Sequence, residues 1–255
     1  MKALKEVPVA EYWRTAKFFG PDYPNKSFIF SVLSRRIPGQ VFSADEAKSS
    51  CMVTTNSSYV FLAGKFGPDF VLQALSHLSD RDDVKMIVPP GQILPGSLPG
   101  GAELVDRVQY AHRGAPPRAE ATIPMGFRLE VLNAELFQRL NWNVATDLFR
   151  DFEGFLRGGY GFCLTHAGDV AAEAYSVVGA GISEPGIYTA PGFRGAGLQR
   201  ILLHELLREA GRRGHQTVLS CDASTHATIA LARRFEMTLD VEYQAVRTVQ
   251  GKRTT

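Results

Sequence analysis

A glycine-rich turn in the second half of the chain, Arg194-Gly195-Ala196-Gly197, has the residue types and the position of an anion-binding site. Residues 186–190 predict a strand that runs into Pro191-Gly192, and the apolar stripe of residues 195–213 predicts a long helix after the turn. The first amides of a helix lack partners and carry the positive end of the helix dipole, while glycines let a phosphate approach the backbone. The turn therefore predicts a pyrophosphate site, with a charge-assisted hydrogen bond from Arg194, in preference to a plain strand-to-helix connection.

Two other nucleotide-binding patterns are excluded. Gly179-Ala180-Gly181 begins like a dinucleotide-binding fingerprint, but its third glycine position is Glu184, and Pro185 and a strand follow in place of a helix. A nucleotide-dependent oxidoreductase, which would depend on that pattern alone, is therefore disfavoured. Gly195-Ala196-Gly197 also lacks the Gly-Lys-Ser/Thr ending of a P-loop.

Two glutamates near the turn are candidates for proton transfer. Glu184 opens the strand that leads to the turn, where we expect it to act as a general base. The alternative is an exposed loop carboxylate, because Pro185-Gly186 disturbs the strand. Glu173 lies among apolar neighbours in the predicted strand 170–178, so its carboxylate faces either a cleft or solvent.

Other polar residues have weaker cases for chemistry. Asp222 follows a predicted strand and is either a catalytic residue or a turn or helix-cap residue before Ser224. Tyr243 lies on the last strand and is either a buried core side chain or a general acid. Cys221 fits a buried structural thiol, and His226 an exposed side chain. The six histidines form no ligand-spaced cluster, so no metal is expected.

These residues need a set of alternating strands and helices to position them. From residue 126 onward the patterns predict one strand, two helices, three strands, a helix, a strand, a helix and a final strand. The remaining strands are expected at 127–131, 160–165, 170–178, 217–221 and 239–246, and the remaining helices at 144–157, 224–234 and after Asn133, which can cap its helix. His166-Ala167-Gly168-Asp169 predicts a hairpin turn.

The first half is α/β and carries no recognisable chemistry. Tyr59–Gly64 and Val84–Val88 predict buried strands, and Pro68–Leu78 has helical spacing. The linker-like residues 114–121 predict two domains, a smaller α/β domain at 1–120 and a second at 121–255. We expect the first to pack against the second and to wall off part of a substrate cleft. No internal repeat is visible.

The composition is that of an ordinary globular protein. Of 255 residues, 45% are hydrophobic and 21% charged, and the net charge of +2 gives no case for nucleic acid or a membrane as partner. Three isolated cysteines fit a reducing compartment, and neither a leader sequence nor an apolar run of about 18 residues is visible. The expected location is the cytoplasm, and no pattern specifies an oligomeric state.

The segment Thr189-x-Pro191-x-Phe193-Arg194-Gly195-x-Gly197-Leu198, with the strand order, resembles the GNAT superfamily of acyl-CoA-dependent N-acyltransferases over about residues 126–248. More narrowly, the chain resembles the zwittermicin-resistance-type branch, which has an α/β domain before the transferase domain. The segments matched to that branch are Tyr59–Gly64, Phe155-Leu156-x-x-Gly159-Tyr160-Gly161-Phe162-Cys163, Glu173–Ser176 and Thr228–Ala232.

The resemblance implies an α+β fold with a central mixed, largely antiparallel sheet flanked by helices. It also implies direct transfer of an acetyl or other acyl group from acyl-CoA to an amine of a small molecule, such as an antibiotic or a biosynthetic intermediate, with no metal. The expected donor contacts are Tyr188, Thr189, Arg194, Gly195, Ala196, Gly197, Leu198, Gln199 and Ser224, and the catalytic candidates are Glu184, Glu173, Asp222 and Tyr243.

Three departures from the family pattern keep alternatives open. Gln199 stands where a small residue is usual, and Glu236-Met237 replaces a Gly-Phe pair. The helix tyrosine that serves many relatives as general acid falls near Ala232. A non-catalytic acyl-CoA sensor or scaffold is one alternative, and an acyl group delivered on the pantetheine arm of a carrier protein is another.

Overall fold

The computed structural model describes residues 4–44, 49–81, 83–92, 94–99 and 101–248. In the first half of the chain the elements are β1 (Lys5–Glu6), η1 (Val9–Phe18, a 3-10 helix), α1 (Lys26–Leu33), β2 (Gly39–Ser43), β3 (Ser50–Thr55), β4 (Tyr59–Gly64), α2 (Pro68–His77), β5 (Val84–Val88) and β6 (Ala102–His112). In the second half they are β7 (Phe127–Val131), α3 (Ala134–Gln138), α4 (Asn143–Phe149), α5 (Phe152–Gly158), β8 (Gly159–His166), β9 (Asp169–Gly179), β10 (Ile182–Thr189), η2 (Pro191–Phe193), α6 (Leu198–Arg212), β11 (Gln216–Asp222), α7 (His226–Arg234) and β12 (Thr238–Thr248).

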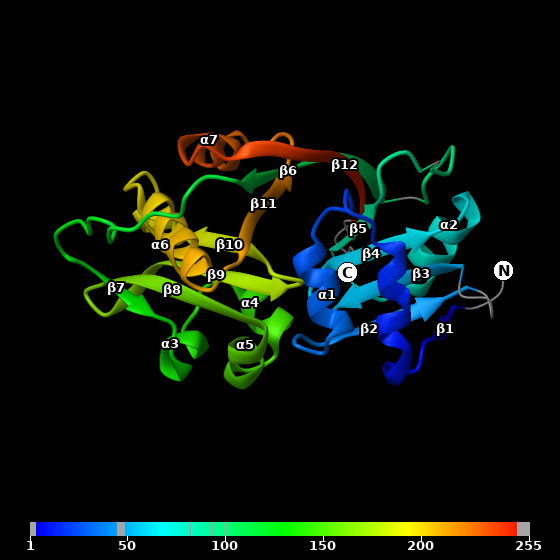
Figure 1. The fold of residues 1–255 in the computed structure, drawn as a ribbon, viewed down its shortest axis with the longest axis horizontal. Helices are drawn as coiled ribbons and strands as arrows, with labels where there is room; N and C mark the ends of the chain where they lie inside the picture. Colours follow the sequence, from blue (N-terminus) through cyan, green and yellow to red (C-terminus); the bar gives the residue numbers. More distant parts are fainter. Residues whose placement is uncertain (1–3, 45–48, 82, 93, 100, 249–255) are drawn as a thin grey trace, which may run out of the picture.

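Within these residues, twelve strands form one sheet in the order β1-β2-β3-β4-β5-β12-β6-β11-β10-β9-β8-β7. Neighbours are antiparallel except for two parallel pairs, β4 with β5 and β10 with β11. Helices flank the sheet (Figure 1). The predicted fold class, a mixed and largely antiparallel sheet with flanking helices, is confirmed.

The two halves of the chain repeat one arrangement, which no sequence repeat revealed. Each half has antiparallel strands followed by a helix and a strand that pairs in parallel with the strand before that helix. Each half then gives its last strand to the other: β6 pairs with β11, and β12 pairs with β5. Figure 1 shows β6 and β12 running across the junction between the halves, so the two predicted domains share one sheet.

Helix boundaries differ from the predictions at three places: α7 begins at His226, two residues after the expected start, and the other two differences have local reasons. The stripe at 144–157 forms two helices, because Arg150 takes a positive φ of 72° and Asp151 starts a new helix by accepting a hydrogen bond from the Gly154 amide at 2.6 Å. The helix after the glycine turn begins at Leu198, since Gly195 and Gly197 take φ values of 82° and 74° that a right-handed helix does not contain.

Other local predictions are confirmed. Asn133 caps α3 by accepting a hydrogen bond from the Leu136 amide at 2.9 Å. The turn between β8 and β9 contains Ala167 and Gly168 at φ values of 50° and 93°, which fits a two-residue hairpin. Gly179-Ala180-Gly181 is also a hairpin turn, between β9 and β10, which agrees with its exclusion as a nucleotide motif.

Helices from different halves cover the two faces of the sheet beside β10. On one face α6 buries a stripe that includes Leu202 and Leu206 against β8, β9 and β10. On the other face α1, from the first half, packs on β9 and β10 as well as on β3. Gly179 permits this contact, because a Cβ there would overlap the carbonyl oxygen of Ser27 in α1. The first half thus packs directly on the strand that carries Glu184.

Candidate active site

Strands β10 and β11 diverge and leave an opening in the sheet. Their parallel pairing joins Ile182 to Gln216 and Ser183 to Thr217, and no further pair follows along the described strands. Two residues beyond the last pair on β10 stands Pro185, which has no amide hydrogen to give to a neighbouring strand. A cavity of about 280 Å³ occupies the opening.

Both faces of the sheet contribute to this cavity. On the face covered by α1, four aromatic side chains line it: Phe28, Tyr59, Trp142 and Tyr175. On the α6 face it is lined by Gln199 at the start of α6 and by Thr228 and Leu231 of α7. The cavity therefore joins the two faces, and the first half of the chain supplies part of its wall.

Glu184 lies at the narrow end of the opening, on β10, and lines the cavity. Glu184 is only 3% exposed, and its carboxylate forms no ion pair within the part of the chain that the structure describes. Oε1 accepts a hydrogen bond from Asn25 Nδ2 at 2.5 Å, and Oε2 accepts one from Ser27 Oγ at 2.6 Å. Burial raises the pKa of the Glu184 carboxyl above its usual value, while the hydrogen bonds from Ser27 and Asn25, the nearby Ser220 hydroxyl and the charge of Arg107 limit that rise. A carboxylate with a raised pKa is a stronger proton acceptor than an ordinary exposed one.

The glycine turn lies on the surface at the end of β10. Arg194, Gly195, Ala196 and Gly197 are all exposed, and Arg194 Nε donates to the Thr189 carbonyl at 3.5 Å. Within the described chain, the amides of Gly195, Ala196 and Gly197 donate no hydrogen bond to another backbone group. Nothing lies within 4 Å of the position that a Cβ would take on Gly195 or Gly197. The turn is therefore open to an anion, and Gln199, two residues after Gly197, lines the cavity.

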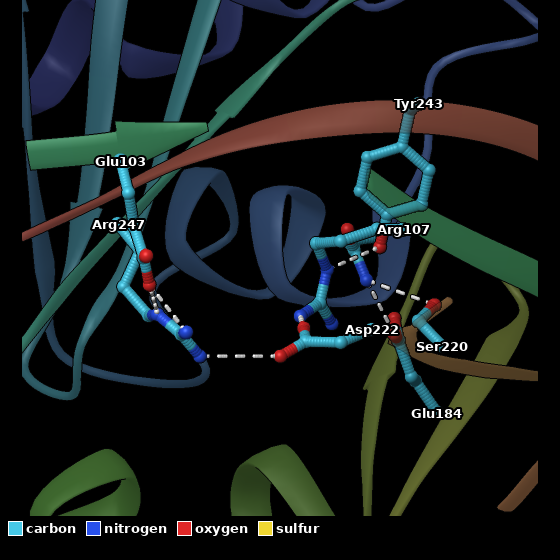
Figure 2. A network of polar contacts seen from close by, with 8 residues as sticks. Glu103, Arg107, Glu184, Ser220, Asp222, Tyr243 and Arg247 are labelled. Atoms are coloured by element: carbon cyan, nitrogen blue, oxygen red, sulfur yellow. Dashed lines mark hydrogen bonds and ion pairs between the residues drawn. The ribbon is translucent and has the colours of Figure 1, made fainter. Parts of the chain in front are cut away.

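Asp222 and Tyr243 are brought together by Arg107 of β6, as Figure 2 shows. The Arg107 guanidinium is buried, forms an ion pair with Asp222, and donates from Nε to the Tyr243 hydroxyl at 3.1 Å. Burial raises the pKa of Tyr243 to about 12 against the opposing effect of Arg107. Arg247 extends the cluster by pairing with both Asp222 and Glu103. Arg107 and Tyr243 line a second cavity, of about 480 Å³, and neither lines the cavity that holds Glu184.

Glu173 and Ser224 lie outside both cavities. Glu173 is buried on β9, and its carboxylate accepts hydrogen bonds from the amides of Asn141 and Trp142 at 2.8 and 2.7 Å. It therefore holds the segment that places Trp142 in the cavity wall. Tyr188 supports the same ring from β10 by stacking on it at 6.1 Å between centroids. Ser224 is exposed in the turn before α7.

Sequence reasoning missed the residues that contact the candidates from elsewhere in the chain. Asn25 and Ser27 reach Glu184 across more than 150 positions, and Arg107 reaches Asp222 across 115. Pro24-Asn25 signals only a helix start, and Arg107 stands in an unremarkable strand. No local pattern could have connected them to the site.

Other features limit the choice of site. No group of three or more His, Cys, Asp or Glu side chains placed to hold a metal ion occurs among the described residues. The three cysteines are buried and free. None of the helices described is long and apolar enough to cross a membrane.

Comparison with known proteins connects this geometry to a family. A model of the GNAT acetyltransferase family matches residues 18–246. A Bacillus subtilis (strain 168) protein named "Uncharacterized N-acetyltransferase YdfB" is 23% identical over 262 residues, covering 95% of this chain and 98% of that protein.

Solved structures with the same fold include a GCN5-related N-acetyltransferase-like protein from Streptococcus suis, with a TM-score of 0.72 at 20% identity over 94% of this chain and 98% of that one. Another is a GNAT-family protein described as a putative acetyltransferase from Novosphingobium aromaticivorans, with a TM-score of 0.58 at 18% identity over 89% and 98%. Because the family model spans most of the sequence, the protein belongs to the GNAT acetyltransferase family, whose members transfer an acyl group from acyl-CoA.

Proposed function

We propose that the protein transfers an acetyl or other acyl group from acyl-CoA directly to the amine of a small molecule, in the opening between β10 and β11. The observation that carries the proposal is the early separation of these strands with a buried carboxylate, Glu184, beside the cavity they leave. Gln199, two residues after the open amides of the glycine turn, lines the same cavity. An extended thioester arm could therefore run from the turn, past Gln199, to Glu184.

Each part of the donor has a complementary place on the protein. The pyrophosphate is assigned to the amides of Gly195, Ala196 and Gly197, at the positive end of the α6 dipole, with Arg194 beside them. The residues we assign to donor binding are Tyr188, Thr189, Arg194, Gly195, Ala196, Gly197, Leu198, Gln199 and Ser224. The acceptor then enters from the opposite face, where Phe28, Tyr59, Trp142 and Tyr175 line the cavity.

The chemistry needs one base and one proton for the leaving group. The acceptor nitrogen, after giving a proton to the Glu184 carboxylate directly or through water, attacks the thioester carbonyl carbon. The carbon–sulfur bond breaks, the nitrogen loses its second proton, and the departing thiolate takes up that proton directly or through water, so an amide and free CoA result. A neutral tyrosine is a suitable proton source, but the Tyr243 hydroxyl is bonded to Arg107 outside this cavity. We therefore assign Asp222 and Tyr243 to holding Arg107, and Glu173 to holding Trp142.

Two finer assignments are also proposals. The α/β first half, which packs against the transferase half, supports placement in the zwittermicin-resistance-type branch. Buried, unpaired cysteines are consistent with a reaction in the cytoplasm.

The test compares wild type with Glu184→Gln, a substitution that keeps the shape and removes the base. The protein is incubated with acetyl-CoA and a panel of amines, thiol release is followed, and CoA affinity is measured by calorimetry. Glu184→Gln should retain CoA affinity within about twofold and lose turnover by roughly 10²–10⁴-fold. Wild-type turnover in this variant would refute the role of Glu184, and CoA binding without turnover on any amine by wild type would identify a sensor.

A further inference from the structure

Glu184 is held by side chains of the first half of the chain, and these give that half a part in catalysis. We propose that Asn25 and Ser27 are positioning residues, which fix the Glu184 carboxylate at the cavity and keep it ionised. The inference depends on the proposed role of Glu184 as base. It extends that role to a helix that lies more than 150 positions earlier in the sequence.

Both side chains that bind the Glu184 carboxylate are hydrogen-bond donors. Asn25 Nδ2 donates to one carboxylate oxygen at 2.5 Å, and Ser27 Oγ donates to the other at 2.6 Å. An ionised carboxylate has only acceptor sites, so a donor on each oxygen favours the charged form. The two donors together also fix the orientation of the carboxylate, because its oxygens are bound from the N-cap and the first turn of α1.

The Asn25 side chain binds Glu184 in place of capping its own helix. It occupies the N-cap position of α1, where an asparagine side chain commonly accepts a hydrogen bond from the first turn, yet it makes no cap bond. Its backbone takes the left-handed conformation, with φ at 54°, and its Oδ1 is buried without a partner in the described structure. The side chain is turned away from its helix and toward Glu184 and Ser220.

A second layer holds Asn25 in place. Gln109 Oε1 accepts from the Asn25 amide at 2.8 Å and from Ser220 Oγ at 3.2 Å. Gln109 in turn donates to Asp240 at 2.8 Å. Asn25 is therefore fixed by residues of β6, β11 and the β12 segment, all in the sheet that carries Glu184.

The other ionisable groups near Glu184 do not account for its ionised form by themselves. The Arg107 guanidinium contributes through its charge without a direct bond. Burial raises the pKa of Tyr175 on β9 well above its usual value and that of Tyr243 on β12 to about 12, so neither phenol carries charge near neutral pH. Asp83 and Lys85 line the cavity from the first half.

Ser27 has a matched control on its own helix. Ser31 lies one turn later and is equally buried, but its Oγ has no hydrogen-bond partner among the described residues. Ser27→Ala and Ser31→Ala therefore remove the same atom from the same helix, and only the first removes a donor from Glu184.

The experiment measures kcat/KM for one amine from pH 5 to 9 in both variants and expresses each as a ratio to wild type, which cancels the ionisation of the amine. Loss of one donor to the ionised carboxylate should raise the pKa of Glu184 further. The ratio for Ser27→Ala should therefore fall at low pH, by about tenfold for one hydrogen bond to a charged group, and approach one at high pH, while the ratio for Ser31→Ala stays flat. Ser27→Cys, with a weak donor, should lie between them.

Three outcomes separate the ideas. A pH-independent loss in Ser27→Ala would overturn the inference, because it indicates a general structural effect. A flat ratio near one for Ser27→Ala would also overturn the inference. If Glu184→Gln still abolishes turnover in that case, the proposed function stands. Full activity of Glu184→Gln would instead refute the role of Glu184 itself.

Discussion

Replacing Gly197 by Ala should weaken CoA binding without disturbing the unliganded turn beyond a local strain. Gly197 has a φ of 74°, and a Cβ there meets nothing within 4 Å. The strain of a left-handed alanine is about 1–2 kcal/mol, which corresponds to a melting-temperature decrease of about 2–4 °C in a protein of this size. If the Cβ occupies the space of a phosphate and one amide-to-phosphate bond is lost, the further cost is about 1.5–3 kcal/mol, or about 10–150-fold in Kd.

The same helix provides the control. Gly214, at the other end of α6, has a φ of 71° and is equally open, so Gly214→Ala imposes the same strain far from the turn. Calorimetry of CoA binding and thermal unfolding of both variants separate strain from ligand contact. The reasoning predicts similar melting temperatures and a weakened Kd only in Gly197→Ala. Equal Kd values in the two variants, whether both normal or both weakened, would refute the assignment of the pyrophosphate to this turn.

Three further substitutions test the supports of the site. Gly179→Ala should force α1 away from β9 and destabilise the protein by about 1–3 kcal/mol in thermal unfolding. It should lower turnover, measured by thiol release, far more than CoA affinity, measured by calorimetry. An unchanged turnover would contradict the contact between α1 and β9. Glu173→Gln leaves one of the two backbone amides that Glu173 binds without an acceptor, so it should lower the free energy of unfolding by about 1–3 kcal/mol. It should also raise KM for the amine while KM for acetyl-CoA stays constant. Equal changes in both constants would argue against a role of Glu173 in placing Trp142. Arg107→Met should lower the free energy of unfolding in urea by about 2–3 kcal/mol. This is less than the roughly 3–5 kcal/mol expected for breaking a fully buried ion pair, because Asp222 is partly exposed and keeps Arg247 as a second partner. An unchanged stability would show that the cluster is dispensable.

The features predicted from sequence are those that depend on neighbours along the chain. The apolar strands β8 and β9, the hairpin turn at Ala167-Gly168 and the cap at Asn133 each follow from a few adjacent residues. The glycine turn belongs to the same group, since its strand-to-helix context lies within about 15 residues. The chemistry of the donor side could therefore be proposed before the fold was known.

The features missed depend on contacts between distant segments. The exchange of β6 and β12 has no local signal, because each strand has the same alternation whichever partner it joins. The predicted helix 144–157 is broken at Arg150, which takes a positive φ. Arginine has no preference for this conformation, so its residue type does not predict the break. Asn25 could be predicted as a helix cap from its type, but its side chain instead binds Glu184.

The most direct test of the account is a structure of the protein with bound CoA. The account predicts the pyrophosphate on the amides of Gly195, Ala196 and Gly197, with the pantetheine arm between β10 and β11 and its sulfur beside Glu184. CoA seated instead in the cavity lined by Arg107 and Tyr243, or with its sulfur on the surface away from β10, would contradict it.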